Sequence, residues 1–407
     1  QVRAALATMR VVVLTGARQT GKTTLAQELG REDGRFFMTL DRPEILELAE
    51  RDPEALWEGL ERVTIDEVQR SPQLLNLLTI EVDRNPAKGR FLLTSSANLL
   101  LMESVSDSLA GRAGYISLPP FTLAERMGTD GGRLLRLLLE ASSSAAVLKL
   151  GTEFPSRDVL KIPRAVFDGG YPEALQLDSD RARNIWREGY VATYLERDLR
   201  NLSAIADLPD FLRLLRLAVL RSGQLVNIDG LARDAGLASS TARRWLNLLE
   251  VSCQTVSLPA YATSRSKRLI KSPKLYPSDS GLACYLCGIS EAAGLESSPQ
   301  FGSLFEAYVL QHLAAFAALL PVRADLLYWR TTRGEEVDFV VETPNRLLPI
   351  EVRTSRTLGK RDLRGLRAFL EEYPDGAPFG VVLYAGQEWM RPARNVVAIP
   401  WSALLGS

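Results

Sequence analysis

The segment Gly16–Thr24 reads GARQTGKTT, and Gly16–Thr23 matches the pattern G-x-x-x-x-G-K-[ST] without a mismatch. A short apolar run, Arg10–Thr15, precedes it, and a helical pattern begins at Lys22. Glycines in such a loop let backbone N–H groups surround an anion, and the start of the following helix adds its positive end. The stretch therefore predicts a site for nucleotide phosphates at the end of a buried strand.

Each residue of this loop has an expected role in binding ATP. Lys22 is expected to reach the β- and γ-phosphates, and the Thr23 hydroxyl is expected to hold Mg²⁺. An ordinary glycine-rich turn is the alternative, but it gives Lys22 no role. The residues expected to contact the nucleotide are Gly16, Ala17, Arg18, Gln19, Thr20, Gly21, Lys22, Thr23 and Thr24.

The apolar run Val63–Ile65 ends in two carboxylates, Asp66 and Glu67. At the end of a parallel strand, Asp66 would face the Mg²⁺ and Glu67 would polarise the attacking water. Solvated acids at an ordinary strand end are the alternative. The phosphate loop earlier in the chain favours the functional interpretation, and the adjacent Glu67 favours hydrolysis over binding alone.

Two further polar groups could act on the γ-phosphate. Ser96 follows another apolar run, Phe91–Thr94, where a hydroxyl could sense that phosphate; a plain serine cluster after a strand is the alternative. Arg112 follows a helical segment and could be an arginine finger that acts on the nucleotide of a neighbouring subunit. A solvated surface arginine is the alternative, because the finger requires an oligomer.

Apolar runs alternate with helical patterns over residues 1–125, which predicts an α/β fold with a parallel, doubly wound sheet. Residues 126–165 contain paired glycines and a serine cluster, and we interpret them as a lid or connecting region. Residues 166–297 have mostly helical patterns, and residues 298–407 mix helix and strand. The sequence thus predicts a P-loop ATPase domain followed by a helical region and a small α/β domain.

Several motifs together resemble one large prokaryotic family. They are the phosphate loop, the stretch IDEVQ at Ile65–Gln69, the stretch LAGR at Leu109–Arg112 and the stretch YLERD at Tyr194–Asp198. In this combination they are similar to AAA-like ATPases that carry a C-terminal DUF4143 region, and the resemblance covers nearly the whole chain. The resemblance implies an ASCE-type P-loop ATPase, a middle winged-helix element and a nuclease-like C-terminal fold.

Residues 226–246 have the pattern of a helix-turn-helix. Its second helix would expose Ser240, Arg243 and Arg244, where DNA-binding proteins contact the major groove. The basic segment Arg265–Lys274, which contains no acid, could be a wing that contacts phosphates. Winged helices also dock proteins, so DNA and a protein partner stay open as alternatives.

Asp338 and Glu351 are expected on neighbouring strands of the C-terminal domain, with Arg353 on the same side as Glu351. This order of acids and base resembles the PD-(D/E)xK nuclease core, in which two carboxylates hold Mg²⁺ and a lysine assists the attacking water. Here Arg353 stands at the lysine position, and a guanidinium stays protonated and cannot act as a base. We expect a nuclease-like fold kept for binding or stability; a second metal site at Asp338 and Glu351 is the alternative.

The composition excludes several classes of protein. Lys+Arg and Asp+Glu are both 49, so the whole chain lacks a basic character for nucleic acid. One histidine and three cysteines argue against a His-ligated zinc site and a disulfide framework, and they fit a reducing cytoplasm. The longest mainly apolar run, Val309–Val322, is shorter than the roughly 20 residues that span a membrane. We expect a cytoplasmic protein without a membrane partner.

The main functional prediction is Mg²⁺-dependent ATP binding and hydrolysis, coupled to rearrangement of the winged-helix and C-terminal regions. One alternative is an ATP-gated module that binds DNA or a protein with little hydrolysis. A second alternative is a metal-dependent nuclease.

Overall fold

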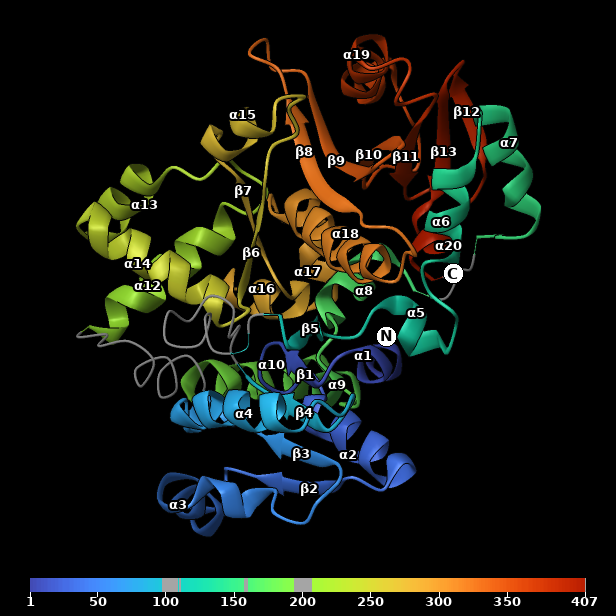
Figure 1. The fold of residues 1–407 in the computed structure, drawn as a ribbon. Coiled ribbons are helices and arrows are strands. Elements are labelled where there is room, and N and C mark those ends of the chain that lie inside the picture. Colours follow the sequence, from blue (N-terminus) through green and yellow to red (C-terminus); the bar gives the residue numbers. More distant parts are fainter. Residues whose placement is uncertain (97–108, 110, 157–159, 194–206, 407) are drawn as a thin grey trace. The chain divides into compact units, whose positions relative to one another are not determined.

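The structure is a computed structural model, and it describes all residues except 97–108, 110, 157–159, 194–206 and 407. The described chain forms two compact units (Figure 1). The first unit contains Gln1–Pro120 and Asn247–Gln254, and the second contains Phe121–Leu246 and Thr255–Ser407. The family stretch YLERD at residues 194–198 lies outside the described residues.

The first unit is built on a parallel sheet with the strand order β2-β3-β4-β1-β5. Strand β4 lies between β1 and β3, and the three strands are parallel. Their carboxyl ends therefore lie at the same edge of the sheet. This arrangement confirms the predicted parallel sheet and adds β5, which was not expected. The strands are β1 Val11–Thr15, β2 Phe36–Thr39, β3 Val63–Asp66, β4 Phe91–Thr94 and β5 Ala113–Ser117.

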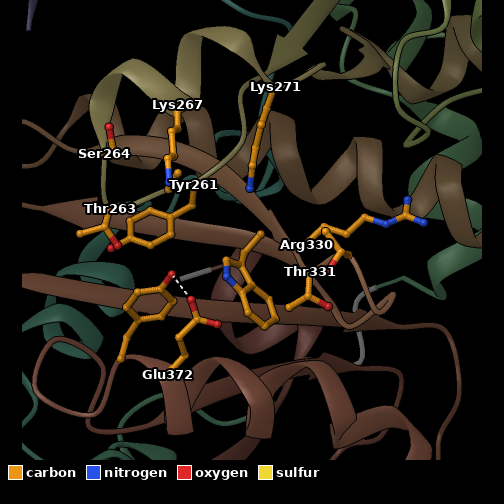
Figure 2. Close-up of a pocket in the computed structure, with 12 residues that line it drawn as sticks. Tyr261, Thr263, Ser264, Lys267, Lys271, Arg330, Thr331 and Glu372 are labelled. Carbon is orange, nitrogen blue, oxygen red and sulfur yellow. Dashed lines mark hydrogen bonds between the residues drawn. The ribbon is translucent and has the colours of Figure 1, made fainter.

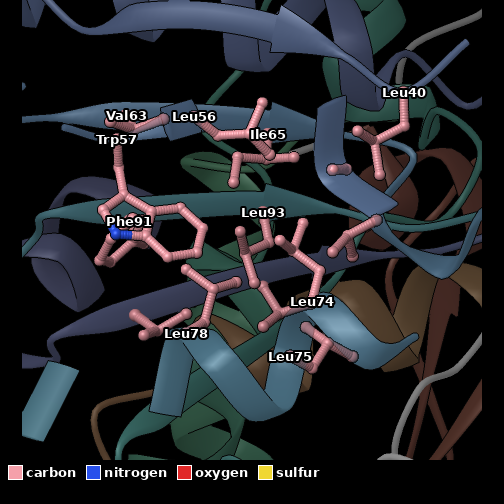
Figure 3. Packing of buried hydrophobic residues seen from close by; sticks show 14 of the residues in the cluster. Leu40, Leu56, Trp57, Val63, Ile65, Leu74, Leu75, Leu78, Phe91 and Leu93 are labelled. Atoms are coloured by element: carbon pink, nitrogen blue, oxygen red, sulfur yellow. The ribbon is translucent and has the colours of Figure 1, made fainter. Parts of the chain in front are cut away.

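Successive residues of a strand point to opposite faces of the sheet, and in the buried strands both sets of side chains are mainly apolar. Helices therefore cover both faces of this sheet. On one face Val11 and Val13 pack with Leu74 and Leu78 of α4, in the cluster drawn in Figure 3. On the other face Val12 and Leu14 pack against α1 and α2. The helices are α1 Val2–Thr8, α2 Lys22–Asp33, α3 Pro43–Arg51 and α4 Gln73–Arg84, with short 3-10 turns η1 Pro53–Leu56 and η2 Val68–Arg70.

The second unit begins with helices. Helix α10 ends at Tyr190, a few residues before the segment 194–206 that lies outside the described residues. The helices are α5 Leu123–Met127, α6 Arg133–Glu140, α7 Ser144–Lys149, α8 Ile162–Asp168, α9 Pro172–Leu175, α10 Asp180–Tyr190, α12 Leu208–Leu220, α13 Ile228–Ala235, α14 Ser239–Val251 (whose residues from Asn247 on belong to the first unit), α15 Arg265–Ile270, α16 Ser280–Leu286 and α17 Ala292–Glu296, with the 3-10 turn η4 Leu150–Thr152.

The C-terminal part of this unit is a mixed sheet with the order β12-β13-β11-β10-β9-β8. Helix α18 packs against β8, β9 and β10, and α19 packs against β9, β10 and β11. A separate antiparallel pair, β6 Thr255–Leu258 and β7 Lys274–Pro277, flanks α15 in the chain. The remaining elements are α18 Phe301–Ala318, β8 Asp325–Arg330, β9 Glu336–Thr343, β10 Arg346–Arg353, η6 Lys360–Leu363, α19 Arg364–Glu372, β11 Gly380–Tyr384, β12 Met390–Ala393, β13 Val396–Pro400 and α20 Trp401–Leu405.

The single histidine, His312, lies buried on α18. The Leu123 backbone N–H donates to its Nε2 at 2.7 Å, so Nδ1 carries the proton and donates to the Tyr308 carbonyl at 2.7 Å. Burial lowers the pKa of His312 to about 4. The imidazole is therefore a neutral structural group. Among the described residues, no helix has both the length and the apolar character needed to cross a bilayer.

Candidate functional site

The loop between β1 and α2 holds a backbone shape that depends on glycine. Gly16 has φ 144° and Gly21 has φ 94°, and Gln19 is also left-handed at φ 60°. A Cβ at Gly16 would lie 2.4 Å from the Leu118 carbonyl oxygen, so no other residue fits there. The loop thus has the compact curvature that lets a main chain surround an anion.

Lys22 is buried in the centre of this loop, with only 4% of its surface exposed. Its ammonium donates to the Gly16 carbonyl at 2.9 Å and to the Ala17 carbonyl at 2.5 Å. Burial lowers the pKa of Lys22 to about 8, although the nearby carboxylates of Glu67 and Asp66 act in the opposite direction. A buried cation held by carbonyl oxygens is well placed to exchange them for the oxygens of a phosphate.

Asp66, at the end of β3, lies next to the start of α2. The Thr23 hydroxyl donates to Asp66 Oδ1 at 2.9 Å, and the Thr94 hydroxyl of β4 donates to the same oxygen at 2.6 Å. A hydroxyl beside a carboxylate fits Mg²⁺, which prefers oxygen ligands and binds proteins through one or two carboxylates together with substrate phosphates. Thr23 and Asp66 are therefore the residues that could hold this ion.

Glu67 follows in a left-handed conformation with φ 59°. Its backbone N–H donates to Thr94 Oγ1 at 3.1 Å, so the hydroxyl of β4 orients both acids. The Gln69 amide contacts the Glu67 carboxylate and donates to Ser96 Oγ at 2.7 Å. Gln69 thereby links the expected catalytic acid to the expected phosphate sensor.

The structure thus brings five of the expected residues together at one edge of the sheet. They are Lys22, Thr23, Asp66, Glu67 and Ser96. The Thr20 hydroxyl closes the loop on the Ala17 carbonyl at 3.0 Å, while Thr24 is exposed on α2. The sequence predicted no role for Gln69. The one feature that could have indicated it is its place two residues after Glu67 in the stretch IDEVQ.

Comparisons with known proteins assign three parts of the chain to families. Family models match residues 8–127 (AAA domain), 160–293 (domain of unknown function DUF8612) and 301–404 (domain of unknown function DUF4143). The uncharacterized proteins Rv2008c of Mycobacterium tuberculosis and Mb2031c of Mycobacterium bovis are each 33% identical to this chain, over 100% of it and 83% of their own length. The chain belongs to the P-loop ATPases that join an AAA domain to a DUF4143 region.

Some solved structures are similar to parts of this chain at lower sequence identity. The walker-type ATPase paby2304 of Pyrococcus abyssi is 17% identical over 70% of this chain and 93% of its own, with a TM-score of 0.40. AMPPCP-bound DnaA from Aquifex aeolicus is 14% identical over 78% of this chain and 92% of its own, with a TM-score of 0.27. Likeness at this level carries no argument about function.

Arg112 of the AAA domain lies away from the phosphate loop. It directly precedes β5, at the amino edge of the parallel sheet, whereas the loop follows the carboxyl end of β1. Its guanidinium binds the Asp83 carboxylate twice, with Nε–Oδ1 at 2.8 Å and Nη2–Oδ2 at 2.7 Å. Within one subunit it cannot be the arginine of this site, and action on a neighbouring subunit stays a prediction.

The two helices of the expected helix-turn-helix pattern at residues 226–246 are present in the DUF8612 region. Helix α13 ends at Gly236, which is left-handed at φ 73°, and α14 follows. Ser240, Arg243 and Arg244 are exposed on α14. Ser239 is the first residue of α14, and its hydroxyl donates to Asp229 Oδ1 at 2.6 Å. The winged-helix assignment and DNA contact by this surface stay predictions.

The basic segment Arg265–Lys274 does not face solvent as a whole. The Arg268 guanidinium binds both oxygens of Glu342 and lies 4.8 Å from the centre of the Tyr261 ring. Lys274 is buried and contacts Glu336. Arg268 forms an ion pair with Glu342, and Lys274 forms an ion pair with Glu336. The expectation that the whole segment contacts phosphates is therefore wrong for these two residues.

In the DUF4143 region Asp338 and Glu351 lie on paired strands, β9 and β10, as expected. Arg353 lies between them: it contacts Glu351, approaches Asp338 Oδ2 at 3.6 Å, and donates to Asp362 Oδ1 at 3.1 Å. The Val352 N–H also donates to Asp338 at 2.8 Å. Among the described residues, no group of three or more His, Cys, Asp or Glu side chains is arranged so that it could hold a metal ion. In this structure the Arg353 guanidinium therefore takes the place beside both carboxylates that the alternative assigned to a metal ion.

The same buried cluster includes Glu306 of α18 and Lys274 of β7. Burial, followed by the charge of Asp338, raises the pKa of Glu306 to about 8, and the Tyr276 hydroxyl donates to it at 3.1 Å. Although burial opposes the shift, the charges of Asp338, Glu306 and Glu336 together raise the pKa of Lys274. Each of these groups thus responds to the charges of the others: the acids stabilise the charged form of Lys274, and Asp338 disfavours the charged form of Glu306.

Proposed function

We propose that this chain binds ATP with Mg²⁺ at the phosphate loop of its AAA domain and hydrolyses it. The observation that carries the proposal is the 2.9 Å contact between Thr23 Oγ1 and Asp66 Oδ1, with Glu67 next in the chain. It joins the phosphate loop to the acidic strand end, and P-loop ATPases need both. Membership of the AAA family supports the same reaction.

The groups of this chain divide the work of binding. The backbone N–H groups of the loop and the Lys22 ammonium would hold the β- and γ-phosphates, with Lys22 leaving the carbonyls of Gly16 and Ala17. Thr23 and Asp66 would hold Mg²⁺, which when bound neutralises charge on the phosphate oxygens. Exchange of hydrogen bonds within the loop for bonds to ATP is what makes binding favourable.

Glu67 is the group that would act on water. Its carboxylate would orient a water molecule in line with the γ-phosphorus and accept a proton as the water oxygen bonds to phosphorus and the bond to the β–γ bridging oxygen breaks. Gln69 would position that carboxylate, and Ser96 would report the presence of the γ-phosphate through the same amide. Thr94 would keep Asp66 and Glu67 in register.

Fusion of the AAA domain with the DUF8612 and DUF4143 regions in one chain supports coupling of hydrolysis to a rearrangement of these regions. The target of that rearrangement is a separate question. The geometry of Arg353 gives no support to a nuclease, so we do not add cleavage to the proposal.

The test is ATP turnover and nucleotide binding by the full chain. We expect Lys22→Met to lose binding, and Glu67→Gln to keep binding while turnover falls by about 10²–10⁴-fold. Lys88→Met, an exposed lysine of the same unit, is the matched control and should match the parent. Removal of Mg²⁺ with EDTA should abolish turnover.

Two results would overturn this assignment. Binding of ATP by Lys22→Met as tight as by the parent would show that the site lies elsewhere. Negligible turnover by the parent, together with ATP-dependent and salt-sensitive retention of DNA, would instead favour the ATP-gated binding module.

A further inference from the structure

Helix α14 is shared between the two units of the chain. Its last residues and the turn after it, Asn247–Gln254, group with the first unit, although the chain before and after them belongs to the second. The same helix is the second helix of the helix-turn-helix pattern. A continuous helix of this kind can carry a displacement from the nucleotide-binding unit to the rest of the chain.

The turn that ends α14 has the hydrogen bonds of a Schellman cap. The Cys253 N–H donates to the Glu250 carbonyl at 3.0 Å, and the Gln254 N–H donates to the Leu249 carbonyl at 2.8 Å. Such a cap needs one left-handed residue, which is usually glycine because a Cβ is strained in that conformation. Here Cys253 adopts it, with φ 57°. The turn is therefore closed with a strain that glycine would avoid.

This strain has a counterpart at the nucleotide site. Among the described residues, the ones other than glycine that have a positive φ are Gln19, Glu67 and Cys253. Gln19 belongs to the phosphate loop, and Glu67 is the expected catalytic acid. Strained backbone gathers at active sites and switch regions, where the surrounding structure maintains it. The conformation of Cys253 is thus of the kind found at the site itself.

Cys253 also lies close enough to Lys22 for their charges to interact. Burial raises the pKa of Cys253 to about 11, and the positive charge of Lys22 acts in the opposite direction. Burial likewise lowers the pKa of Lys22 to about 8. Cys253 keeps part of its surface exposed, whereas Ser252 and Gln254 on either side of it are buried. The turn is therefore part of the surroundings that shield the Lys22 ammonium from water.

The phosphates of ATP would meet an unfavourable neighbour in this turn. The carboxyl end of a helix carries a partial negative charge, which is favourable near an ammonium and unfavourable near an anion. A neutral thiol is only a weak donor, so Cys253 offers a phosphate little in return. A ligand that interacts differently with two states shifts the population toward the state it prefers. ATP at Lys22 therefore favours a state in which the turn has moved away.

The chain on both sides of the turn is packed within the second unit. Before it, Trp245 of α14 packs edge-to-face on Phe211 of α12, with ring centres 5.5 Å apart. After it, Tyr261 lies in the wall of a cavity (Figure 2) and packs edge-to-face on Tyr373, with ring centres 5.2 Å apart. Because both flanks are held by such contacts, a displacement of the turn is passed on to them.

We propose that the turn Ser252–Gln254 covers Lys22 in the nucleotide-free chain and opens when the phosphates of ATP bind, so that α14 transmits nucleotide occupancy to the helix-turn-helix pattern. This inference rests on the proposed function, because it requires ATP at the phosphate loop. Opening lets Cys253 leave its left-handed conformation and breaks the hydrogen bonds to Glu250 and Leu249 that close the turn. Release of the strain at Cys253 lowers the free energy that opening requires.

Hydrogen exchange of the full chain, followed by mass spectrometry of its peptides, tests the opening. With AMPPCP and Mg²⁺, the peptide that covers Asn247–Gln254 should exchange about ten-fold faster than in the nucleotide-free protein. Lys22→Met should show no such change. Helix α18, Phe301–Ala318, is the internal reference and should exchange equally in both states. Titration calorimetry on the same protein measures independently whether AMPPCP binds.

Replacement of the strained residue tests the cover. Cys253→Ala removes the thiol and keeps the Cβ, so AMPPCP should bind about four-fold more tightly because less buried surface has to be displaced. The affinity should also depend less on pH between about 7.5 and about 9, since water would reach Lys22 more easily. Cys287→Ala, at a partly exposed cysteine of the second unit, is the matched control and should bind like the parent. A merely structural role of Cys253 would lower stability and leave both the affinity and its pH dependence unchanged.

The outcomes separate this inference from the proposed function. Binding of AMPPCP together with faster exchange in the turn supports it. Binding with unchanged or slower exchange would overturn it and leave the ATP site in place, as would a Cys253→Ala variant that binds like the parent at every pH. Absence of binding by the parent would instead remove the proposed function, and the inference with it.

Discussion

The lowered pKa of Lys22 predicts that ATP affinity falls as the pH rises through about 8. Burial lowers this pKa to about 8 from the ordinary value of 10.5. ATP would bind the protonated ammonium, so each rise in pH above 8 removes binding-competent protein. The dissociation constant for ATP therefore increases with pH, because the Lys22 ammonium loses one proton.

The magnitude follows from the protonated fraction of Lys22. With a pKa of about 8, the dissociation constant should rise about eight-fold between about pH 7.5 and about pH 9. A lysine with the ordinary pKa would change it by only about 3% over the same interval. The terminal phosphate of ATP has already lost its last proton in this range, since its second pKa is about 6.

Titration calorimetry of ATP with Mg²⁺ at several pH values measures this effect. Lys22→Arg is the matched variant, because arginine stays protonated over the whole interval and any binding it retains should be independent of pH. Lys88→Arg, at an exposed lysine of the same unit, should follow the parent. A parent whose affinity is flat from about pH 7.5 to about pH 9 would refute the reasoning.

Three other changes have expected outcomes. Gln69→Leu should lower the turnover rate by about ten-fold with little change in ATP affinity, because the amide positions the acid rather than the nucleotide; equal losses in both would contradict this. Leu78→Ala should lower the free energy of unfolding in urea by about 2–5 kcal/mol, whereas Ile80→Ala on the exposed side of the same helix should cost far less. Arg112→Ala should keep turnover per subunit within about two-fold, since Asp83 holds this side chain at the far edge of the sheet; a large loss that grows with protein concentration would instead support action on a neighbouring subunit.

The sheet of the first unit was largely predictable because its central strands are short apolar runs. β1, β3 and β4 are buried throughout, and each stands out against the helical patterns around it. β5, with the sequence AGYIS, was not expected because it is only partly buried and has no continuous apolar run. An edge strand of this kind owes its conformation to its neighbour β1.

The phosphate site was predictable because parallel strands place their carboxyl ends together, which brings Asp66 to Thr23. Gln69 was not predictable, since its contact with Glu67 depends on a left-handed backbone at the start of η2. Lys274 also escaped prediction. Lys274 is buried and pairs with Glu336, which lies far from it in the sequence. A local sequence pattern cannot predict such a contact.

The state of His312 has a consequence for solution measurements. With its only imidazole neutral down to about pH 4, this chain lacks the side chain that usually buffers a protein near neutrality. A bend in a rate profile around pH 6 or 7 would therefore have to come from the substrate or from an acid held in apolar surroundings. In a proton NMR spectrum the Hδ2 and Hε1 resonances of the His312 ring should stay fixed across that interval, and their movement would signal that the helix around the ring has opened.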